Sequence, residues 1–145
     1  MFFLGTFDYA MDDRGRLPLP PKYRDAFRDG VFLAQGSPDR CLRLFTREAF
    51  EAKAQQHTIE PDLHRKGRVL RRTFFPGSHD LELDKQNRIL IPPPLREYAR
   101  LAGKVLVVGT GEYLEVWSPE EYAAEMARVD DEAESTLESV DTWER

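Results

Sequence analysis

The chain carries one sequence pattern twice, offset by 72 positions. The segment from Asp12 to Arg24 returns as the segment from Asp84 to Arg96, with an acid, a turn residue, two arginines and a proline step in register. The same offset relates further pairs: Gly5 and Gly77, Asp8 and Asp80, Leu42 and Leu114, Phe45 and Trp117, Thr46 and Ser118, Phe50 and Tyr122. Each half of these 145 residues is near the lower size limit for independent stability. We therefore expect two copies of one unit that fold together around a shared core.

Each copy is predicted to run strand, turn, strand, short helix, strand, strand, helix. Alternating apolar residues, prolines and helix-capping residues define these elements. In the first copy they are strands at 7–11, 17–19, 31–34 and 41–45, a short helix at 22–27 and a helix after Thr46. In the second copy they are strands at 81–83, 89–91, 104–108 and 113–117, a short helix at 95–100 and a helix at 119–129. Short strands without long crossovers favour an α+β fold with a small, partly antiparallel β-barrel at its centre.

The two turns are the most faithfully repeated parts of the pattern. Gly15 and Asn87 occupy equivalent places, and these are the residue types that best tolerate a positive φ. Asp12 and Asp84 open the turns, where a carboxylate can accept hydrogen bonds from the following backbone N–H groups. Each copy is therefore predicted to begin with a hairpin that ends in a tight, exposed tip.

The charge is unevenly distributed along the chain. The formal charge is −5, but residues 118–145 hold ten acids and two bases, which leaves sixteen acids and nineteen bases in residues 1–117. Such a pattern is typical of a polyanion-binding body with an acidic tail, and equally of a solvated helix face. We divide the chain into a first repeat (1–56), a basic linker helix (57–73), a second repeat (74–129) and an acidic tail (130–145). The linker cations could contact DNA or pair with nearby acids.

Several classes of function find little support in the sequence. No apolar run approaches the roughly 20 residues of a membrane span, and no secretory signal is recognisable, so we expect a cytoplasmic protein. The single cysteine, Cys41, lies in an alternating stretch and is expected to be a packing residue. The histidines share no ligand spacing, and no serine lies in a nucleophile or phosphate-loop motif. We expect no enzymatic activity, cofactor or metal. Asp80, Glu82 and Asp84 could bind a cation, but the simpler interpretation is that they form the solvent-exposed face of a strand.

Arg16 and Arg88 are the first candidates for a functional site. Strand alternation directs both away from the core, immediately after the turns. A guanidinium can bind guanine O6 and N7 in the major groove, where a two-stranded ribbon fits. The alternative is that both fold back onto Asp12 and Asp84 as ion pairs that stiffen the turns.

Other cations lie near the same turns in the sequence. Arg14 and Lys85 add a second positive charge within each turn. Three further cations follow the turns in the sequence: Lys22, Arg24 and Arg96. They could contact DNA phosphates, or they could form salt bridges with Asp25 and Glu97.

These residues together resemble the MraZ family of bacterial transcription factors. The resemblance covers essentially the whole chain: the aromatic start before Gly5, the motifs Asp12–Arg16 and Asp84–Arg88, and the basic stretch before Phe74. It implies two tandem swapped-hairpin halves, like those of AbrB and MazE, that share the small barrel. Family DNA-binding residues carry over onto Arg14, Gly15, Arg16, Asn87 and Arg88. Where the family usually has a lysine and a second glycine, this chain has Arg14 and Asn87.

The resemblance also implies a biological role. Proteins of this kind form closed rings and bind G-rich direct repeats in double-stranded DNA at the promoter of the division and cell-wall gene cluster, usually as repressors. It thus implies a homo-oligomer associated with the nucleoid. The alternative from another class is a protein-interaction module of antitoxin or scaffold type, whose tips and acidic tail engage proteins.

Overall fold

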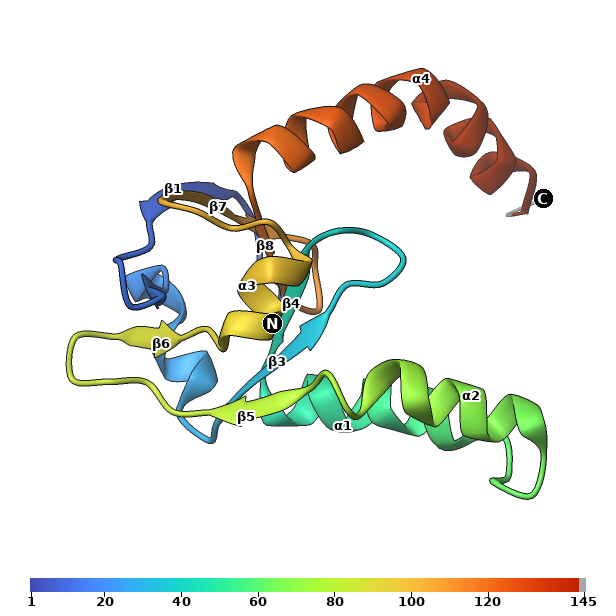
Figure 1. The fold of residues 1–145 in the computed structure, drawn as a ribbon. Helices are drawn as coiled ribbons and strands as arrows, with labels where there is room; N and C mark the ends of the chain where they lie inside the picture. Colours follow the sequence, from blue (N-terminus) through green and yellow to red (C-terminus); the bar gives the residue numbers. More distant parts are fainter. Residues whose placement is uncertain (144–145) are drawn as a thin grey trace.

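In the part of the chain that the structure describes, a six-stranded antiparallel sheet forms the body of the protein. The computed structural model describes residues 1–143 (Figure 1). The strand order is β1-β7-β8-β4-β3-β5, and β2 and β6 form a separate two-stranded ribbon. The strands are β1 (Thr6–Ala10), β2 (Arg16–Pro18), β3 (Val31–Gln35), β4 (Leu42–Phe45), β5 (His79–Leu81), β6 (Arg88–Leu90), β7 (Lys104–Gly109) and β8 (Leu114–Trp117). The expected α+β class is confirmed.

Within residues 1–143, four α-helices and one 3-10 helix complete the fold. They are η1 (Pro21–Phe27), α1 (Arg47–Thr58), α2 (Arg65–Phe74), α3 (Pro93–Tyr98) and α4 (Pro119–Trp143). The expected caps are present, because Thr46 Oγ1 accepts a hydrogen bond from Ala49 N (3.2 Å) and Ser118 Oγ accepts one from Glu121 N (3.1 Å). The last helix is longer than the sequence suggested: it continues past residue 129 through the acidic segment to Trp143.

The sheet has an approximate two-fold axis that relates the repeats. β4 and β8 are neighbours at its centre, and β1 and β5 occupy its two edges. Residues 72 positions apart pair directly with each other at two places, Arg43 with Glu115 and Leu17 with Ile89. The axis therefore passes through both of these pairs, and the ribbon and the sheet share it.

The first strands of the repeats are exchanged between the two halves. β1 pairs with β7 of the second repeat, and β5 pairs with β3 of the first. β2 and β6 pair with each other. The hairpin ladder expected between 7–11 and 17–19 was therefore wrong: the turn is present, but each strand finds its partner in the other repeat. Neither repeat can complete its own sheet, so the two halves fold together.

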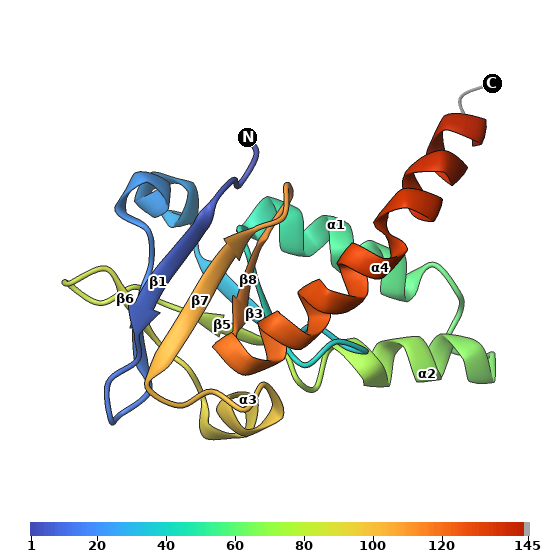
Figure 2. The ribbon, with the colours of Figure 1, turned by 90° about the horizontal axis from the view of Figure 1, so that it is seen from above.

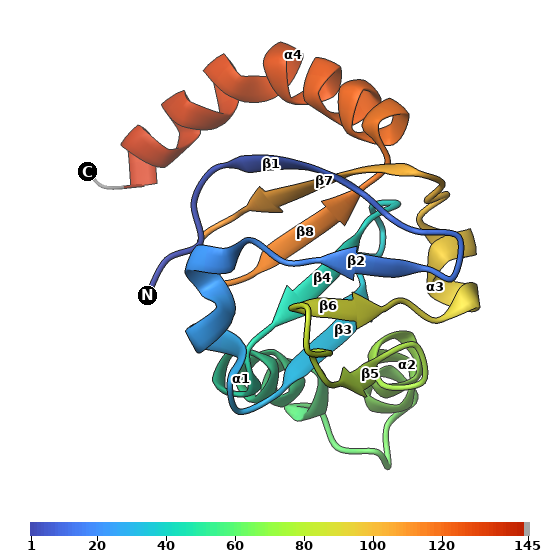
Figure 3. The same ribbon diagram turned by 90° about the vertical axis from the view of Figure 1, so that its left-hand side faces the viewer.

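The core lies between the ribbon and one face of the sheet (Figure 3). The ribbon contributes Leu17, Leu19, Ile89 and Ile91, each at most 1% exposed. They pack against buried side chains of the sheet, including Leu33, Leu42, Leu44, Val105, Val107, Leu114 and Val116. Burying these residues is the main stabilising contribution, and it fixes the ribbon, with its two turns, against the body.

The other face of the sheet carries the long helices (Figure 2). Over the first repeat, α1 and α2 cover Ala34 and Phe45 with a cluster that includes Phe50 and Phe74. Over the second repeat, the first turn of α4 covers Trp117, whose ring centroid lies 5.6 Å from that of Tyr122. None of the described helices is long and apolar enough to cross a membrane.

Candidate nucleic-acid interface

The first turn, residues 12–15, is held together by its own aspartate. Asp12 Oδ1 accepts hydrogen bonds from Arg14 N (3.0 Å) and Arg16 N (2.9 Å). The Arg16 guanidinium donates from Nε to Asp12 Oδ2 at 2.6 Å. Gly15 N donates to Asp12 O at 3.0 Å, and Gly15 has the expected positive φ of 90°. The local sequence therefore specifies a rigid tip.

The second turn, residues 84–87, repeats these contacts. Asp84 Oδ1 accepts hydrogen bonds from Gln86 N (2.8 Å) and Arg88 N (2.9 Å), and Asp84 Oδ2 accepts one from Arg88 Nε (2.9 Å). Asn87 has a φ of 61°, as expected for the position equivalent to Gly15. Two structurally equivalent tips thus flank one ribbon.

Arg16 and Arg88 lie together on the outer face of that ribbon. Leu17 and Ile89 between them point into the core, so alternation places both arginines on the opposite side. Their side chains are 34% and 24% exposed. Arg88 Nη1 also lies 3.8 Å from Asp12 Oδ2, which links the two turns. Both arginines form the ion pairs anticipated as an alternative, and both remain on one shared outer surface.

These contacts lower the pKa of both turn aspartates. At Asp12 the largest cause is the backbone hydrogen bond from Arg16, and the Arg16 guanidinium adds to it. At Asp84 desolvation opposes the change, but hydrogen bonds from the backbone of Arg88 and Gln86 and from the Arg88 guanidinium outweigh it, so the pKa is also lowered. Both carboxylates are therefore ionised at neutral pH, and each orients an arginine by charge as well as by geometry.

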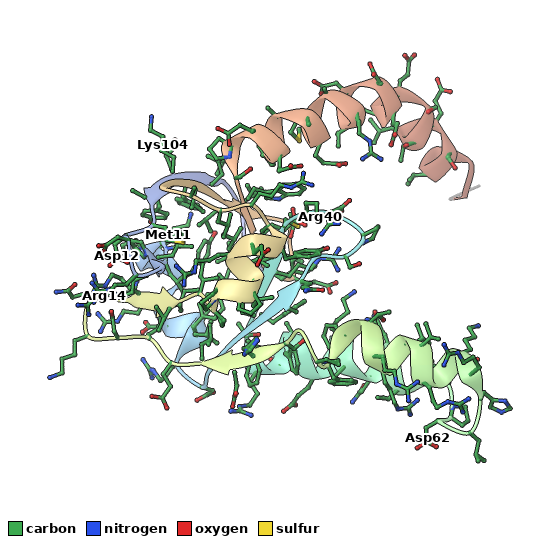
Figure 4. All side chains as sticks on the ribbon, viewed as in Figure 1. Met11, Asp12, Arg14, Arg40, Asp62 and Lys104 are labelled. Carbon is green, nitrogen blue, oxygen red and sulfur yellow. The ribbon has the colours of Figure 1, made fainter. Side chains whose placement is uncertain are left out.

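Arg14 and Lys85 lie outside the ion pairs that Arg16 and Arg88 form with the turn aspartates. Both side chains are exposed, and Arg14 lies beside Asp12 at the outer end of the molecule, opposite Arg40 and Asp62 (Figure 4). No ion pair of either side chain is present among residues 1–140, for which side chains are described. These two cations can therefore meet a phosphate or a base without breaking an ion pair.

Arg96 reaches the first tip from the second repeat. Its guanidinium lies directly against Gly15, where an added Cβ would come within 2.7 Å of Arg96 Cζ. Arg96 Nε is buried there without a hydrogen-bond partner. This placement, which the sequence did not reveal, brings a third guanidinium to the tip that already carries Arg14 and Arg16.

The second tip is built differently around Asn87. Asn87 Nδ2 donates to Leu19 O at 3.0 Å, so the second tip has an amide side chain at the position where Gly15 has none. Arg24, the equivalent of Arg96, is exposed on η1. Lys22 is also exposed, with its ammonium over the rings of Phe7 (5.7 Å) and Tyr23 (5.0 Å). The amide of Asn87 therefore distinguishes the second tip from the first, where the Arg96 guanidinium lies against Gly15.

Replacing Gly15 by alanine should weaken the first tip. A Cβ at φ +90° is strained by about 1–2 kcal/mol, and it would also displace the Arg96 guanidinium. Gly111→Ala is the matched control, because Gly111 has a φ of 92° with open space around its missing Cβ. We expect similar losses in unfolding free energy by urea denaturation, but reduced DNA affinity only for Gly15→Ala. Equal DNA affinities for the two variants would show that Arg96 does not contribute to the tip.

The other candidate residues have structural contacts. Cys41 is fully buried, as expected, and burial together with the nearby Glu115 carboxylate raises the pKa of its thiol. The carboxylate of Asp84 is bound within its own turn, and no group of three potential ligands is placed to hold a metal ion among the described residues. In the basic segment, Arg71 and Arg68 donate to backbone carbonyls of the loop between α1 and α2, including Glu60 O at 2.8 Å and Asp62 O at 2.9 Å.

Comparison with known proteins agrees with the duplication of the chain. A model of the MraZ protein family, described as antitoxin-like, matches residues 2–72 and again residues 74–141, one match for each repeat. The chain is 42% identical to the transcriptional regulator MraZ of Thermomicrobium roseum over 85% of this chain and 86% of the relative. It is 39% identical to that of Roseiflexus castenholzii over 88% and 89%, and 38% identical to that of Salinispora tropica over 95% and 96%. The chain belongs to the MraZ family.

Proposed function

We propose that this protein is a transcriptional regulator that binds double-stranded DNA through the two turns of its ribbon. The observation that carries the proposal is the shared outer surface on which Arg16 and Arg88 are oriented by ionised aspartates, with Arg14 and Lys85 exposed beyond them. A two-stranded ribbon fits the major groove, and a guanidinium can bind guanine through two hydrogen bonds. The relatives named transcriptional regulators support the same role.

We also infer that the repeats are swapped-hairpin halves around a barrel-like core. The exchange of β1 and β5 between the repeats, and the ribbon lying across the sheet, support this architecture. It places both tips at one end of the molecule (Figure 1), so that a single chain presents them to the same DNA face.

Tight binding then requires several chains. One tip with two or three cations binds DNA weakly, since non-specific dissociation constants of about 10⁻⁴ to 10⁻⁶ M are typical at physiological salt. The family resemblance implies a ring acting on G-rich direct repeats of the division and cell-wall gene cluster, as a repressor at the nucleoid. In such a ring, contacts after the first are intramolecular and raise affinity roughly 10²- to 10⁴-fold.

The number of repeats in the DNA should therefore control affinity. Duplexes selected by the protein from a random pool would be rebuilt with one, two, three or four copies of the recovered site. We expect mobility shifts to show affinity rising steeply from one copy to three, and falling as salt is added. A scrambled duplex of equal length is the control. Equal binding to one and three copies would contradict the proposal.

A further inference from the structure

The two repeats differ in how the helix that follows their last strand is covered, α1 after β4 and α4 after β8. α1 and α4 begin at equivalent caps, and Phe50, Ala54 and His57 of α1 correspond to Tyr122, Met126 and Val129 of α4. On α1 this face is covered by α2 of the same chain. Phe74, which is 7% exposed, stacks on Phe50 at 5.3 Å and on His57 at 4.4 Å.

The equivalent face of α4 has no such cover among the described residues. After the contact of Tyr122 with Trp117 the helix leaves the body, and Val129 and Leu137 are 39% and 65% exposed. The apolar stripe follows helical spacing: Tyr122, Met126, Val129, Ala133, Leu137 and Val140. From Met126 to Val140 it runs about 21 Å, longer than one intramolecular contact at its base requires. Such a face on a helix of 25 residues is suited to an intermolecular contact.

Charge identifies the surface that fits this stripe. Residues 119–143 contain nine acids and one base, whereas α2 contains five bases and no acid. On the outer face of α2, Arg65, Val69 and Arg72 follow one another at helical spacing, and all three are exposed, Val69 by 42%. An apolar centre flanked by cations on α2 thus complements an apolar stripe flanked by acids on α4.

The two surfaces cannot meet within one chain in this fold. Figures 1 and 3 place α4 and α2 on opposite sides of the body. The start of α4 is anchored by its Ser118 cap, by Tyr122 on Trp117 and by an ion pair between Glu121 and Arg100. A contact between α4 and its own α2 would break these interactions, so the complementary surface must come from another molecule.

We propose that α4 of one copy docks on the outer face of α2 of a second copy. Each chain then offers one of each surface, so the contact is head-to-tail and repeats from subunit to subunit, closing into a ring if the rotation allows. This inference rests on the proposed function for its ring, and it names the surfaces that build it.

Charge reversal provides the test. One variant carries Arg65→Glu and Arg72→Glu on α2, a second carries Asp130→Lys and Glu134→Lys on α4, and a third carries all four changes. All four positions are exposed, so circular dichroism should show folded proteins. By light scattering at one protein concentration, we expect the wild type to be oligomeric, each two-site variant to fall toward the mass of one chain, and the four-site variant to regain the wild-type mass.

Three results would overturn the inference: a monomeric wild type, two-site variants that keep the wild-type mass, or a four-site variant that does not reassemble. If α4 instead docked on the exposed N-terminal residues of a neighbour, Met1, Phe2 and Leu4, the α2 variant would keep the wild-type mass. A second measurement separates assembly from DNA binding: the affinity for a duplex with one copy of the site, which the α4 variant should retain within about twofold of the wild type.

A variant that no longer assembles but still binds the one-copy duplex supports the inference. A wild type that binds no DNA specifically contradicts the proposed function alone.

Discussion

Arg16→Ala is expected to abolish specific DNA binding and to leave the protein folded. The turn does not depend on the guanidinium alone, because Asp12 still accepts hydrogen bonds from the backbone N–H groups of residues 14 and 16. What is lost is the oriented guanidinium on the outer face of the ribbon. One bidentate contact to a base accounts for about 1–3 kcal/mol, or about 5- to 150-fold in affinity, and the loss multiplies over the subunits bound to one DNA. Fluorescence anisotropy with a three-copy duplex measures it.

Arg40→Ala is the matched control for this experiment. It removes the same charge from an exposed arginine that packs over Tyr98, on the side of the molecule away from the turns (Figure 4). We expect its affinity to stay close to that of the wild type. A folded Arg16→Ala protein with unchanged affinity would refute the assignment of Arg16, and an equal loss for both variants would indicate a non-specific effect of charge.

Leu17→Ala should produce the largest loss of stability, about 2–5 kcal/mol in the free energy of unfolding. Leu17 is fully buried and pairs with Ile89 on the two-fold axis, between the ribbon and the sheet. A cavity at this point loosens the attachment of the ribbon, and both turns depend on that attachment for their position. Urea denaturation measures the change, and DNA affinity should fall with it.

Two further variants make this result specific. Ile89→Ala removes the partner of Leu17 across the axis and should cost a similar amount, because both side chains are fully buried in equivalent places. Leu90→Ala changes the outer face of the same ribbon, where Leu90 is 55% exposed, and should stay within about 0.5 kcal/mol of the wild type. If Leu90→Ala destabilised the protein as much as Leu17→Ala, the inner and outer faces of the ribbon would be wrongly assigned.

The sequence alone predicted the features that depend on residues close together in the chain. The duplication, the positive φ at Gly15 and Asn87, the carboxylates that cap the turns and the helix caps at Thr46 and Ser118 all follow from local backbone and hydrogen-bonding requirements. Alternation also predicted that Leu17 and Ile89 face inward and that the arginines beside them face outward.

Only the tertiary structure decided which strands pair and which side chains meet at the turns. Alternation predicts which face of a strand is buried but not which strand it pairs with, so the exchange of β1 and β5 between the repeats did not follow from it. The same holds for Arg96, which reaches Gly15 only because α3 of the second repeat packs beside the first turn. Contacts between distant segments depend on how all the buried faces of the chain pack together. Short-range sequence patterns therefore do not predict them.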